Sequence, residues 1–180
     1  MARGLETFLD GLGALRPRDR RRAARTAARA WARELAAGQH VDPAAFVRPI
    51  AGNGRSPEVV WIEGIPLHAI CPHHLLPVRG VAHVAYVPGD GLAPLGQVAR
   101  LVQAAASRLI LQEDLAELIA SSLERATGAP GTACVVEASH DCMSARGPRA
   151  LSATARVLAR RGTLARGPLA RKLLGRWERA

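Results

Sequence analysis

The chain has 180 residues, 48% of them hydrophobic and 22% charged, which is typical of one compact globular domain. No run of about 18 apolar residues is present, which argues against a membrane-spanning helix. The charged residues near the N-terminus argue against a signal peptide. We therefore expect a cytoplasmic protein with no membrane partner.

The net charge of +10, from 25 basic and 15 acidic residues, has two interpretations. A basic chain can bind nucleic acid or another polyanion. Lys172 is the only lysine, however, and the arginines stand among alanines, as a GC-rich genome would produce. Stacking aromatic residues, which a single-strand binder would use, are not interleaved with the arginines. We expect no nucleic-acid partner, and a phosphorylated small molecule would use part of the charge.

The first 50 residues are expected to form an N-terminal helical segment. Residues 18–37 are rich in alanine, arginine and leucine without an internal glycine or proline, which predicts a helix that ends at Gly38. Residues 41–57 are rich in proline, glycine and asparagine and are predicted to form a loop.

Residues 51–180 are expected to form the second part of a single globular unit. Strands are predicted over residues 58–70, 78–87, 132–139 and 151–159, a helix pair over 95–109 and 112–126, and a basic terminal helix from 163 onward. Two hairpins that flank a helix pair predict an α+β fold, with an antiparallel sheet and helices on one face. The open edges of such a sheet favour assembly with other subunits.

Three residues that suit a metal ion lie at the ends of predicted strands. Cys71 and His74, in a Cys-x-x-His pattern, fall at a turn between two strands, and Cys142 follows a third strand. Three nitrogen and sulfur ligands leave one coordination position for water, as in catalytic zinc sites. The alternatives are an accidental Cys-x-x-His pattern and a buried core thiol at Cys142. Cys134 lies inside a strand, where a core role is expected.

Two further histidines stand beside these ligands. His73 precedes His74, and His140 lies two residues before Cys142. Histidine is the side chain best suited to transfer protons near neutral pH. A metal that activates water, flanked by two proton carriers, is typical of a hydrolase.

These residues lie in motifs that resemble those of the GTP cyclohydrolase I family. Residues 70–77 (ICPHHLLP) resemble its C-E-H-H-hydrophobic motif, and residues 140–147 (HDCMSARG) resemble H-x-C-M-x-x-R-G. Residues 95–100 resemble L-S-K-x-x-R, and residues 111–115 resemble V-Q-E-R-L. The similarity runs in order along nearly the whole chain.

The resemblance implies a T-fold that assembles into a ring, commonly a decamer of two pentamers, with active sites between subunits. It implies that Zn²⁺ is held by Cys71, His74 and Cys142. The implied reaction is hydrolysis of the guanine ring of GTP at C8, with release of formate, leading to 7,8-dihydroneopterin triphosphate.

The resemblance also implies roles for six residues around the metal. His140 would donate a proton at the opening ring, and His73 would support proton transfer nearby. Glu113 would accept hydrogen bonds from the guanine N–H groups, with Gln112 alongside. The structural alternative for Glu113 is a helix-start carboxylate favoured by the helix dipole. The two arginines of the family pattern that remain here, as substrate-binding residues, are Arg100 and Arg146.

The chain departs from the family where the family contacts phosphate and sugar. Gly96 and Gln97 stand in place of its serine and lysine. The T-P-x-R-V-A motif aligns with residues 23–28, where its arginine is absent or displaced by one. Three hypotheses follow: ordinary pterin formation with compensating arginines such as Arg25, a less phosphorylated or modified purine substrate, or ring opening without cyclisation. A non-catalytic zinc scaffold and a basic nucleic-acid binder are alternatives from other classes.

Overall fold

The structure is a computed structural model that describes residues 1–13, 15–52, 58–89 and 91–178. Its helices are α1 (Ala2–Gly11), α2 (Pro17–Ala30), the π-helix η1 (Trp31–Leu35), the 3-10 helix η2 (Pro43–Phe46), α3 (Leu95–Ala106), α4 (Gln112–Thr127), α5 (Asp141–Ser144) and α6 (Pro168–Glu178). Its strands are β1 (Ile50–Ala51), β2 (Val60–Ile70), β3 (Pro77–Val87), β4 (Gly91–Leu92), β5 (Gly131–His140) and β6 (Ala155–Gly162).

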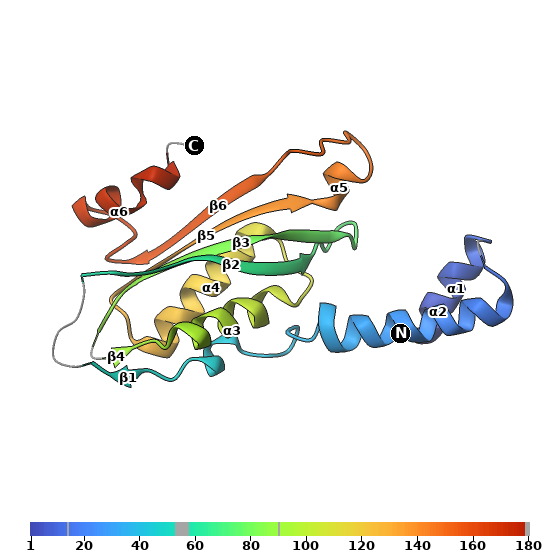
Figure 1. Ribbon diagram of the computed structural model, residues 1–180, viewed down its shortest axis with the longest axis horizontal. Coiled ribbons are helices and arrows are strands. Elements are labelled where there is room, and N and C mark those ends of the chain that lie inside the picture. Colours follow the sequence, from blue (N-terminus) through green and yellow to red (C-terminus); the bar gives the residue numbers. More distant parts are fainter. Residues whose placement is uncertain (14, 53–57, 90, 179–180) are drawn as a thin grey trace.

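The centre of the molecule is a four-stranded antiparallel sheet in the order β2-β3-β5-β6. Valine, isoleucine and alanine alternate along these strands, so one side chain in two points toward the helices. A register shift between Ile62 and Ile65 interrupts the β2–β3 ladder, and Gly64 takes a φ of 69° there. The α+β fold with an antiparallel sheet is confirmed (Figure 1).

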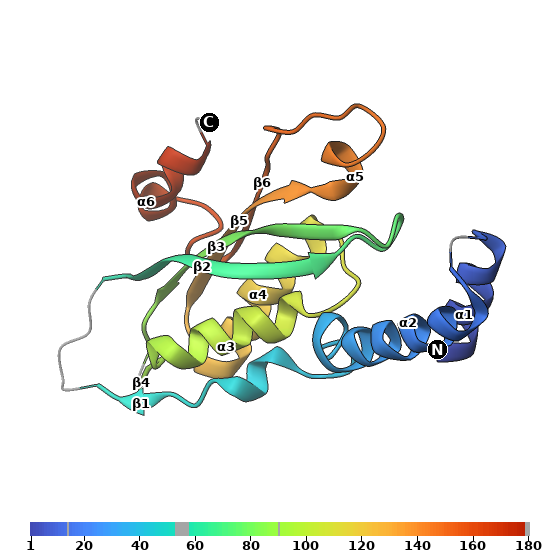
Figure 2. The ribbon, with the colours of Figure 1, turned by 45° about the vertical axis from the view of Figure 1, so that its right-hand side comes forward.

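The helix pair α3 and α4 covers one face of the sheet, as predicted (Figures 1 and 2). The main core lies between these layers and includes fully buried Leu101, Leu115 and Ile119, together with Val84 and Cys134 from the strands. Cys134 is therefore a core residue, as its position inside a strand indicated. The fold buries aliphatic side chains here because aromatic residues make up only 3% of the chain.

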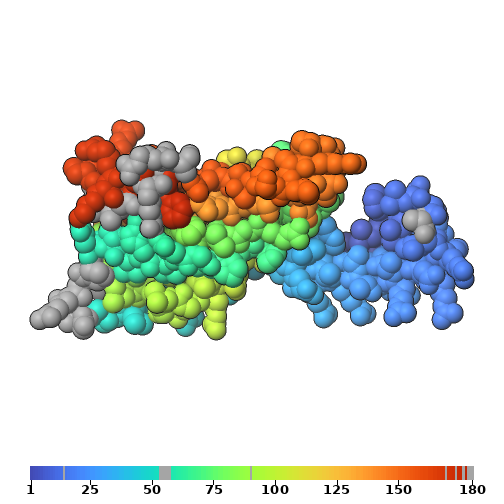
Figure 3. Space-filling model, turned by 45° about the horizontal axis from the view of Figure 1, so that its top comes forward, coloured from blue at the N-terminus to red at the C-terminus, as the bar shows by residue number. Residues whose placement is uncertain are grey.

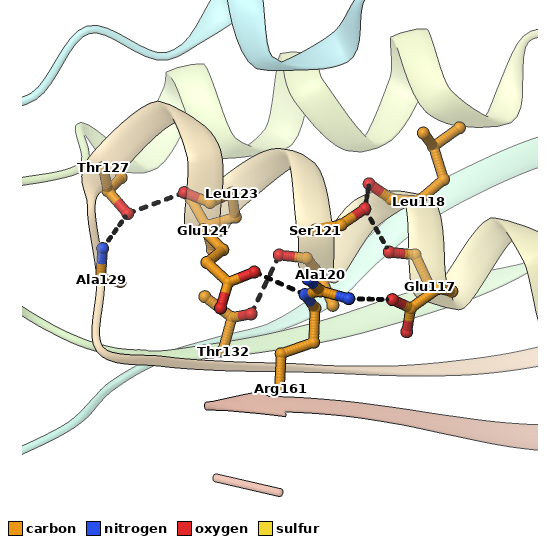
Figure 4. Close-up of polar contacts among 10 residues, drawn as sticks. All are labelled: Glu117, Leu118, Ala120, Ser121, Leu123, Glu124, Thr127, Ala129, Thr132 and Arg161. Atoms are coloured by element: carbon orange, nitrogen blue, oxygen red, sulfur yellow. Dashed lines mark hydrogen bonds and ion pairs between the residues drawn. The ribbon is translucent and has the colours of Figure 1, made fainter. Parts of the chain in front are cut away.

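Helix α4 is fastened to the sheet by polar contacts along its length (Figure 4). Arg161 of β6 forms ion pairs with Glu117 and Glu124, and its Nε lies 2.6 Å from Glu124 Oε2. These two glutamates raise the pKa of Arg161 through hydrogen bonds. The buried Thr132 hydroxyl donates to the carbonyl of Ala120 at 2.9 Å. These contacts tie the middle and the C-terminal half of α4 to β5 and β6.

Several boundaries differ from the predictions. The predicted helix over residues 18–37 is α2 followed by η1, and α1 lies in the expected N-terminal helical segment but was not predicted as a separate helix. The last strand begins at Ala155 rather than at residue 151 and runs to Gly162. The predicted loop over 41–57 contains η2 and β1, and its residues 53–57 lie outside the described part. The boundary between residues 50 and 51 stays a prediction.

The N-terminal helices α1 and α2 form a hairpin that extends beyond the body of the molecule (Figures 1 and 3). Helix α1 buries none of its residues, and α2 buries only Ala24. Arg20 pairs with Asp10 across the hairpin. Among the described helices, none is both long and apolar enough to cross a membrane.

Helix α6 packs on the opposite face of the sheet from the helix pair. Leu164 and Leu174 form a second, smaller core with Ala85 and Ala133 of the strands. The terminal helix was predicted, but its packing against the second face of the sheet was not. It covers one end of that face only, away from α5 (Figure 1).

His83 of β3 lies beneath α6 on this second face. Its ring stacks on Trp177 with 4.5 Å between ring centroids, and neither ring nitrogen has a hydrogen-bond partner among the described residues. Burial lowers the pKa of His83; Glu137 opposes this shift and Arg156 adds to it. The folded protein therefore favours neutral His83.

This burial predicts a pH dependence of stability. The unfolded chain binds a proton at His83 with the ordinary pKa of 6.5, whereas the folded chain binds it only at lower pH. The free energy of unfolding should thus fall as the pH is lowered through about 6.5. Urea unfolding at several pH values should show a shallower decline in His83→Leu, whereas substitution of the exposed His40 by glutamine should leave it unchanged. An identical decline in His83→Leu would contradict the prediction.

Candidate metal centre and its cavity

The first candidate ligands lie in the tight turn that joins β2 to β3. The backbone N–H of Cys71 donates to Leu76 O at 2.9 Å, and the N–H of Leu75 donates to Cys71 O at 2.9 Å. Leu75 adopts a left-handed φ of 55°, which reverses the chain. Pro72 interrupts the strand ladder, as its missing N–H requires. The turn therefore presents Cys71 and His74 from one rigid loop.

The third candidate ligand lies in the next strand connection along the sheet. Cys142 belongs to the short helix α5, which begins directly after β5 ends at His140. Because β3 pairs with β5 and Val78 lies opposite His140, the two ligand-bearing turns meet at the same end of the sheet (Figures 1 and 2).

The three ligand atoms form one compact group. The donor atoms of Cys71, His74 and Cys142 all lie within 4.8 Å of one another. Cys71 Sγ and His74 Nδ1 are 3.7 Å apart. Cys71 is buried, Cys142 is half-buried and His74 is exposed, so the group opens to solvent on one side. Three nitrogen and sulfur donors with an open side fit a zinc site that retains a position for water.

The electrostatics of the thiols also fit a cation. Burial raises the pKa of Cys142, and the neighbouring Cys71 raises it further. Arg146 acts weakly in the opposite direction. Two sulfur groups so close together resist joint deprotonation, and a divalent cation between them reverses this balance because a coordinating thiol is deprotonated.

The connection between α3 and α4 forms another wall of the site. Ile70 at the end of β2 exchanges backbone hydrogen bonds with this connection: its N–H donates to Arg108 O and its carbonyl accepts from the N–H of Ile110, both at 3.1 Å. This short parallel bridge brings the start of α4 beside Cys71. Glu113 is exposed in the first turn of α4.

The site forms a cavity of about 300 Å³, and seven of the nine predicted site residues line it. Besides the three candidate ligands, it is lined by His73, His140, Gln112 and Glu113. Apolar residues that the sequence analysis did not single out complete the wall. They are Pro72, Val78, Ile110, Leu111, Met143 and Ala155. A polar cluster over an apolar wall suits a flat heterocyclic ligand.

The two predicted arginines lie outside this cavity. Arg100 is exposed on α3 and lines a separate hollow beside Gly38, Val41 and Phe46. Arg146 is exposed after α5. Their roles in substrate binding stay predictions, because within one chain neither borders the cavity.

Gln112 has a structural function that the sequence did not reveal. Its side-chain N–H₂ donates to Val136 O at 2.8 Å and to Ala155 O at 3.0 Å, which ties the start of α4 to β5 and β6. Those two acceptors fix the orientation of the amide. Its Oε1 is buried without a partner among the described residues and remains available as an acceptor. Its role toward a substrate stays a prediction.

The structure is that of an α+β protein with three nitrogen and sulfur donors, which could hold a metal ion, grouped at one end of an antiparallel sheet. The sequence model of GTP cyclohydrolase I matches residues 1–175. The chain therefore belongs to the GTP cyclohydrolase I family.

Individual relatives agree with this membership. The chain is 43% identical to GTP cyclohydrolase 1 of Bifidobacterium longum over 77% of its own length and 69% of the relative. It is 36% identical to that of Campylobacter lari over 77% and 73%. Its match to that of Leifsonia xyli is 45% identical but covers only 60% of this chain and 56% of the relative.

A solved structure supports the fold. The archaeosine synthase QueF-Like in the apo form matches with a TM-score of 0.51 and 19% identity, covering 60% of this chain and 97% of that chain. At this identity the similarity concerns the fold alone, and it agrees with the expected T-fold.

The two neighbouring residues Gln112 and Glu113 should respond differently to substitution. Gln112→Leu removes the donor of two hydrogen bonds in a buried position, so it should lower the free energy of unfolding by about 1–3 kcal/mol. Glu113→Gln changes an exposed carboxylate and should leave stability within about 0.5 kcal/mol. Urea unfolding of both variants measures the difference, and equal losses would contradict the anchoring role of Gln112.

Proposed function

We propose that this protein is a zinc-dependent hydrolase that opens the guanine ring of GTP at C8, releases formate and leads to 7,8-dihydroneopterin triphosphate. The observation that carries the proposal is the single cavity that unites the Cys71, His74 and Cys142 cluster with two histidines and a carboxylate. A purely structural metal site would need only its ligands. Family membership gives the same reaction class.

Cys71, His74 and Cys142 would hold the zinc ion, with the open side of the cluster toward the cavity. When bound in a three-ligand site, zinc lowers the pKa of a coordinated water to about 7 and so supplies a nucleophile at neutral pH.

His73 and His140 would handle the protons of the reaction. They reach the cavity from the two different ligand turns, so they flank the metal cluster. Addition of water at C8 and cleavage of the imidazole ring require a proton at the departing ring nitrogen, which His140 would donate. A second water releases formate from the opened ring, and His73 would support that proton transfer.

Glu113 would orient the base. Its carboxylate is a pure acceptor, and guanine presents adjacent N–H donors along one edge. Glu113 directly follows Gln112, which anchors the start of α4, so the anchor would keep the distance between the recognised edge and the metal cluster constant. The exposed carboxylate is available for a ligand, whereas the Gln112 amide nitrogen is already engaged.

A second candidate is ring opening of a less phosphorylated or modified purine nucleotide, with or without cyclisation. Gln97 stands where the family has lysine, and its Oε1 accepts a hydrogen bond from the backbone N–H of Arg48 at 2.8 Å. An uncharged side chain that is held by the backbone offers no cation to a phosphate. The residues that line the cavity within the described chain include no arginine or lysine.

The assembly is part of the proposal. Arg100 and Arg146 do not border the cavity of their own chain, so phosphate contacts from them would require a neighbouring subunit or a movement on binding. We propose a homo-oligomer, a ring that forms a decamer of two pentamers.

The test is to load the reduced protein with zinc and offer GTP, GDP, GMP and guanosine separately. Formate from GTP, together with a pterin that becomes fluorescent after oxidation, would support the first function. Formate without pterin, or only from a less phosphorylated substrate, would support the second. No formate from any of them, with zinc bound, would favour a non-catalytic scaffold. Cys142→Ala should abolish formate release, whereas Cys134→Ala, which alters a buried cysteine outside the cavity, should retain it.

Recognition of the base by Glu113 predicts a selective kinetic defect. Glu113→Gln replaces one acceptor by a donor, so kcat/KM for the accepted nucleotide should fall about 10- to 100-fold, as for loss of a hydrogen bond to a charged group. The adjacent exposed Asp114 does not line the cavity, and Asp114→Asn is the matched control. Equal effects of both substitutions on steady-state kinetics would refute base recognition by Glu113.

A further inference from the structure

An ion pair connects the two turns that carry the candidate metal ligands. Arg79 Nη2 donates to Asp141 Oδ1 at 2.6 Å. Arg79 lies on β3, two residues after the strand leaves the first ligand turn at Pro77. Asp141 lies between His140 and Cys142 and opens α5. The Asp141 side chain is only 16% exposed, whereas that of Arg79 is 56% exposed.

The position of this ion pair matters because the backbone ladder stops just before it. The last register pair of β3 and β5 is Val78 with His140. From Asp141 onward, strand pairing no longer restrains the chain that carries Cys142. The Arg79 guanidinium is the side chain of β3 that reaches across to it, while Ser139 Oγ donates to Arg79 O at 3.3 Å from the neighbouring register position.

Asp141 is also tied to its own turn. Its Oδ1 accepts a hydrogen bond from Ser144 Oγ at 3.4 Å, and its carbonyl accepts from the N–H of Ala145 at 2.9 Å. These contacts fix the Asp141 carboxylate relative to α5. A restraint on this carboxylate therefore also restrains the rest of the turn, including Cys142.

We propose that Arg79 and Asp141 are positioning residues that hold Cys142 against Cys71 and His74 before the metal binds. The inference rests on the metal ligands proposed above. Two ligands come from one turn and the third from another. Metal binding therefore restricts the motion of the second turn relative to the first, which costs conformational entropy. A restraint that already fixes the turn reduces that entropic cost and raises metal affinity.

The inference predicts a coupled loss of zinc affinity. Zinc affinity of the full-length apoprotein would be measured by competition with a chelator for Arg79→Met, Asp141→Asn and the double variant. Each single variant should bind zinc about three- to tenfold more weakly. This loss is larger than that expected from breaking an exposed ion pair and smaller than that from removing a residue bonded directly to a metal ligand. The double variant should be no weaker than the weaker single variant, because the same interaction is lost once. Arg79→Lys should retain part of the affinity.

Cobalt substitution gives a second measurement that a merely structural role would not change. The visible absorption bands of Co²⁺ bound to sulfur and nitrogen ligands depend on coordination geometry. Arg79→Met and Asp141→Asn should shift or broaden these bands in the same way. Unchanged spectra together with unchanged zinc affinity would overturn the inference.

A matched control exists on the same face of the same sheet. Arg156 of β6 forms an ion pair with Glu137 of β5, its register partner inside the β5–β6 ladder, one pair before that ladder ends at Ala138 and Ala155. Arg156→Met and Glu137→Gln should leave zinc affinity unchanged, because neither residue touches a ligand turn. Weaker zinc binding in these controls, or additive losses in the Arg79 and Asp141 variants, would overturn the inference.

The experiment separates this inference from the proposed function. If the unaltered protein binds no zinc, or if Cys142→Ala binds it equally well, the ligand assignment fails and the inference fails with it. If the unaltered protein binds one zinc per chain and the coupled loss is absent, only the positioning role fails.

Discussion

The site depends on the antiparallel pairing of β3 with β5. This pairing places Val78 opposite His140, and therefore sets the turn after β2 beside the turn after β5. In a strand ladder, a slip of one residue moves every side chain to the other face of the sheet. Such a slip would expose Val84 and Cys134, which are fully buried against the helix pair. The hydrophobic core thus fixes the register, and the register brings together ligands separated by about 70 residues of sequence.

Helix α4 supplies the second half of the site and is positioned independently of the metal ligands. Its first residue, Gln112, is bonded to β5 and β6, and its later turns are bonded through Thr132 and Arg161. The contacts near Gln112 are buried and strongly restrain the helix, whereas the partly exposed ion pairs of Arg161 add less. The position of Glu113 is therefore fixed relative to the sheet, as are the positions of the two turns that carry the candidate ligands. Under the proposed function, a base-recognising carboxylate and a metal cluster on one rigid layer would keep a constant separation, which a reaction at one atom of a base requires.

The sequence predicts the local part of this arrangement well. Cys71 and His74 follow a strand that Pro72 interrupts, and Cys142 follows the end of another strand. The proline and the strand ends are visible in the residue types, whereas the short helix α5 was not predicted. Alternation of large and small residues located β3, and the strand-forming residues of TACVVEAS located β5. The family resemblance placed Glu113 and Gln112 beside them, and the structure brings both to the cavity.

What the sequence could not provide depends on contacts between distant residues. Arg79 and Asp141 are 62 positions apart, and Gln112 reaches acceptors 24 and 43 positions away. The hydrophobic periodicity of a sequence does not indicate which distant polar residues will contact each other. Helix α1 received no range of its own in the sequence analysis; in the structure it packs on α2 and buries none of its residues. The start of β6 was set too early because residues 151–154 resemble strand residues but lie outside the ladder with β5.

Two departures from the family, Gly96 and Gln97, lie on an element that does not build the candidate metal cluster. Gly96 and Gln97 belong to the first turn of α3, and Gln97 is bonded to the segment after η2 rather than to the ligand turns. A Cβ added at Gly96 would meet no atom within 4 Å, so the packing of this chain does not require glycine there. The fold of this chain therefore does not require glycine in place of the family's serine at position 96. Because the α3 surface can change without moving β3, β5 or α4, substitutions there leave the candidate metal cluster in place. The residues at positions 96 and 97 thus bear on what the outer surface of α3 contacts, while the two turns beside the cavity keep all three candidate ligands.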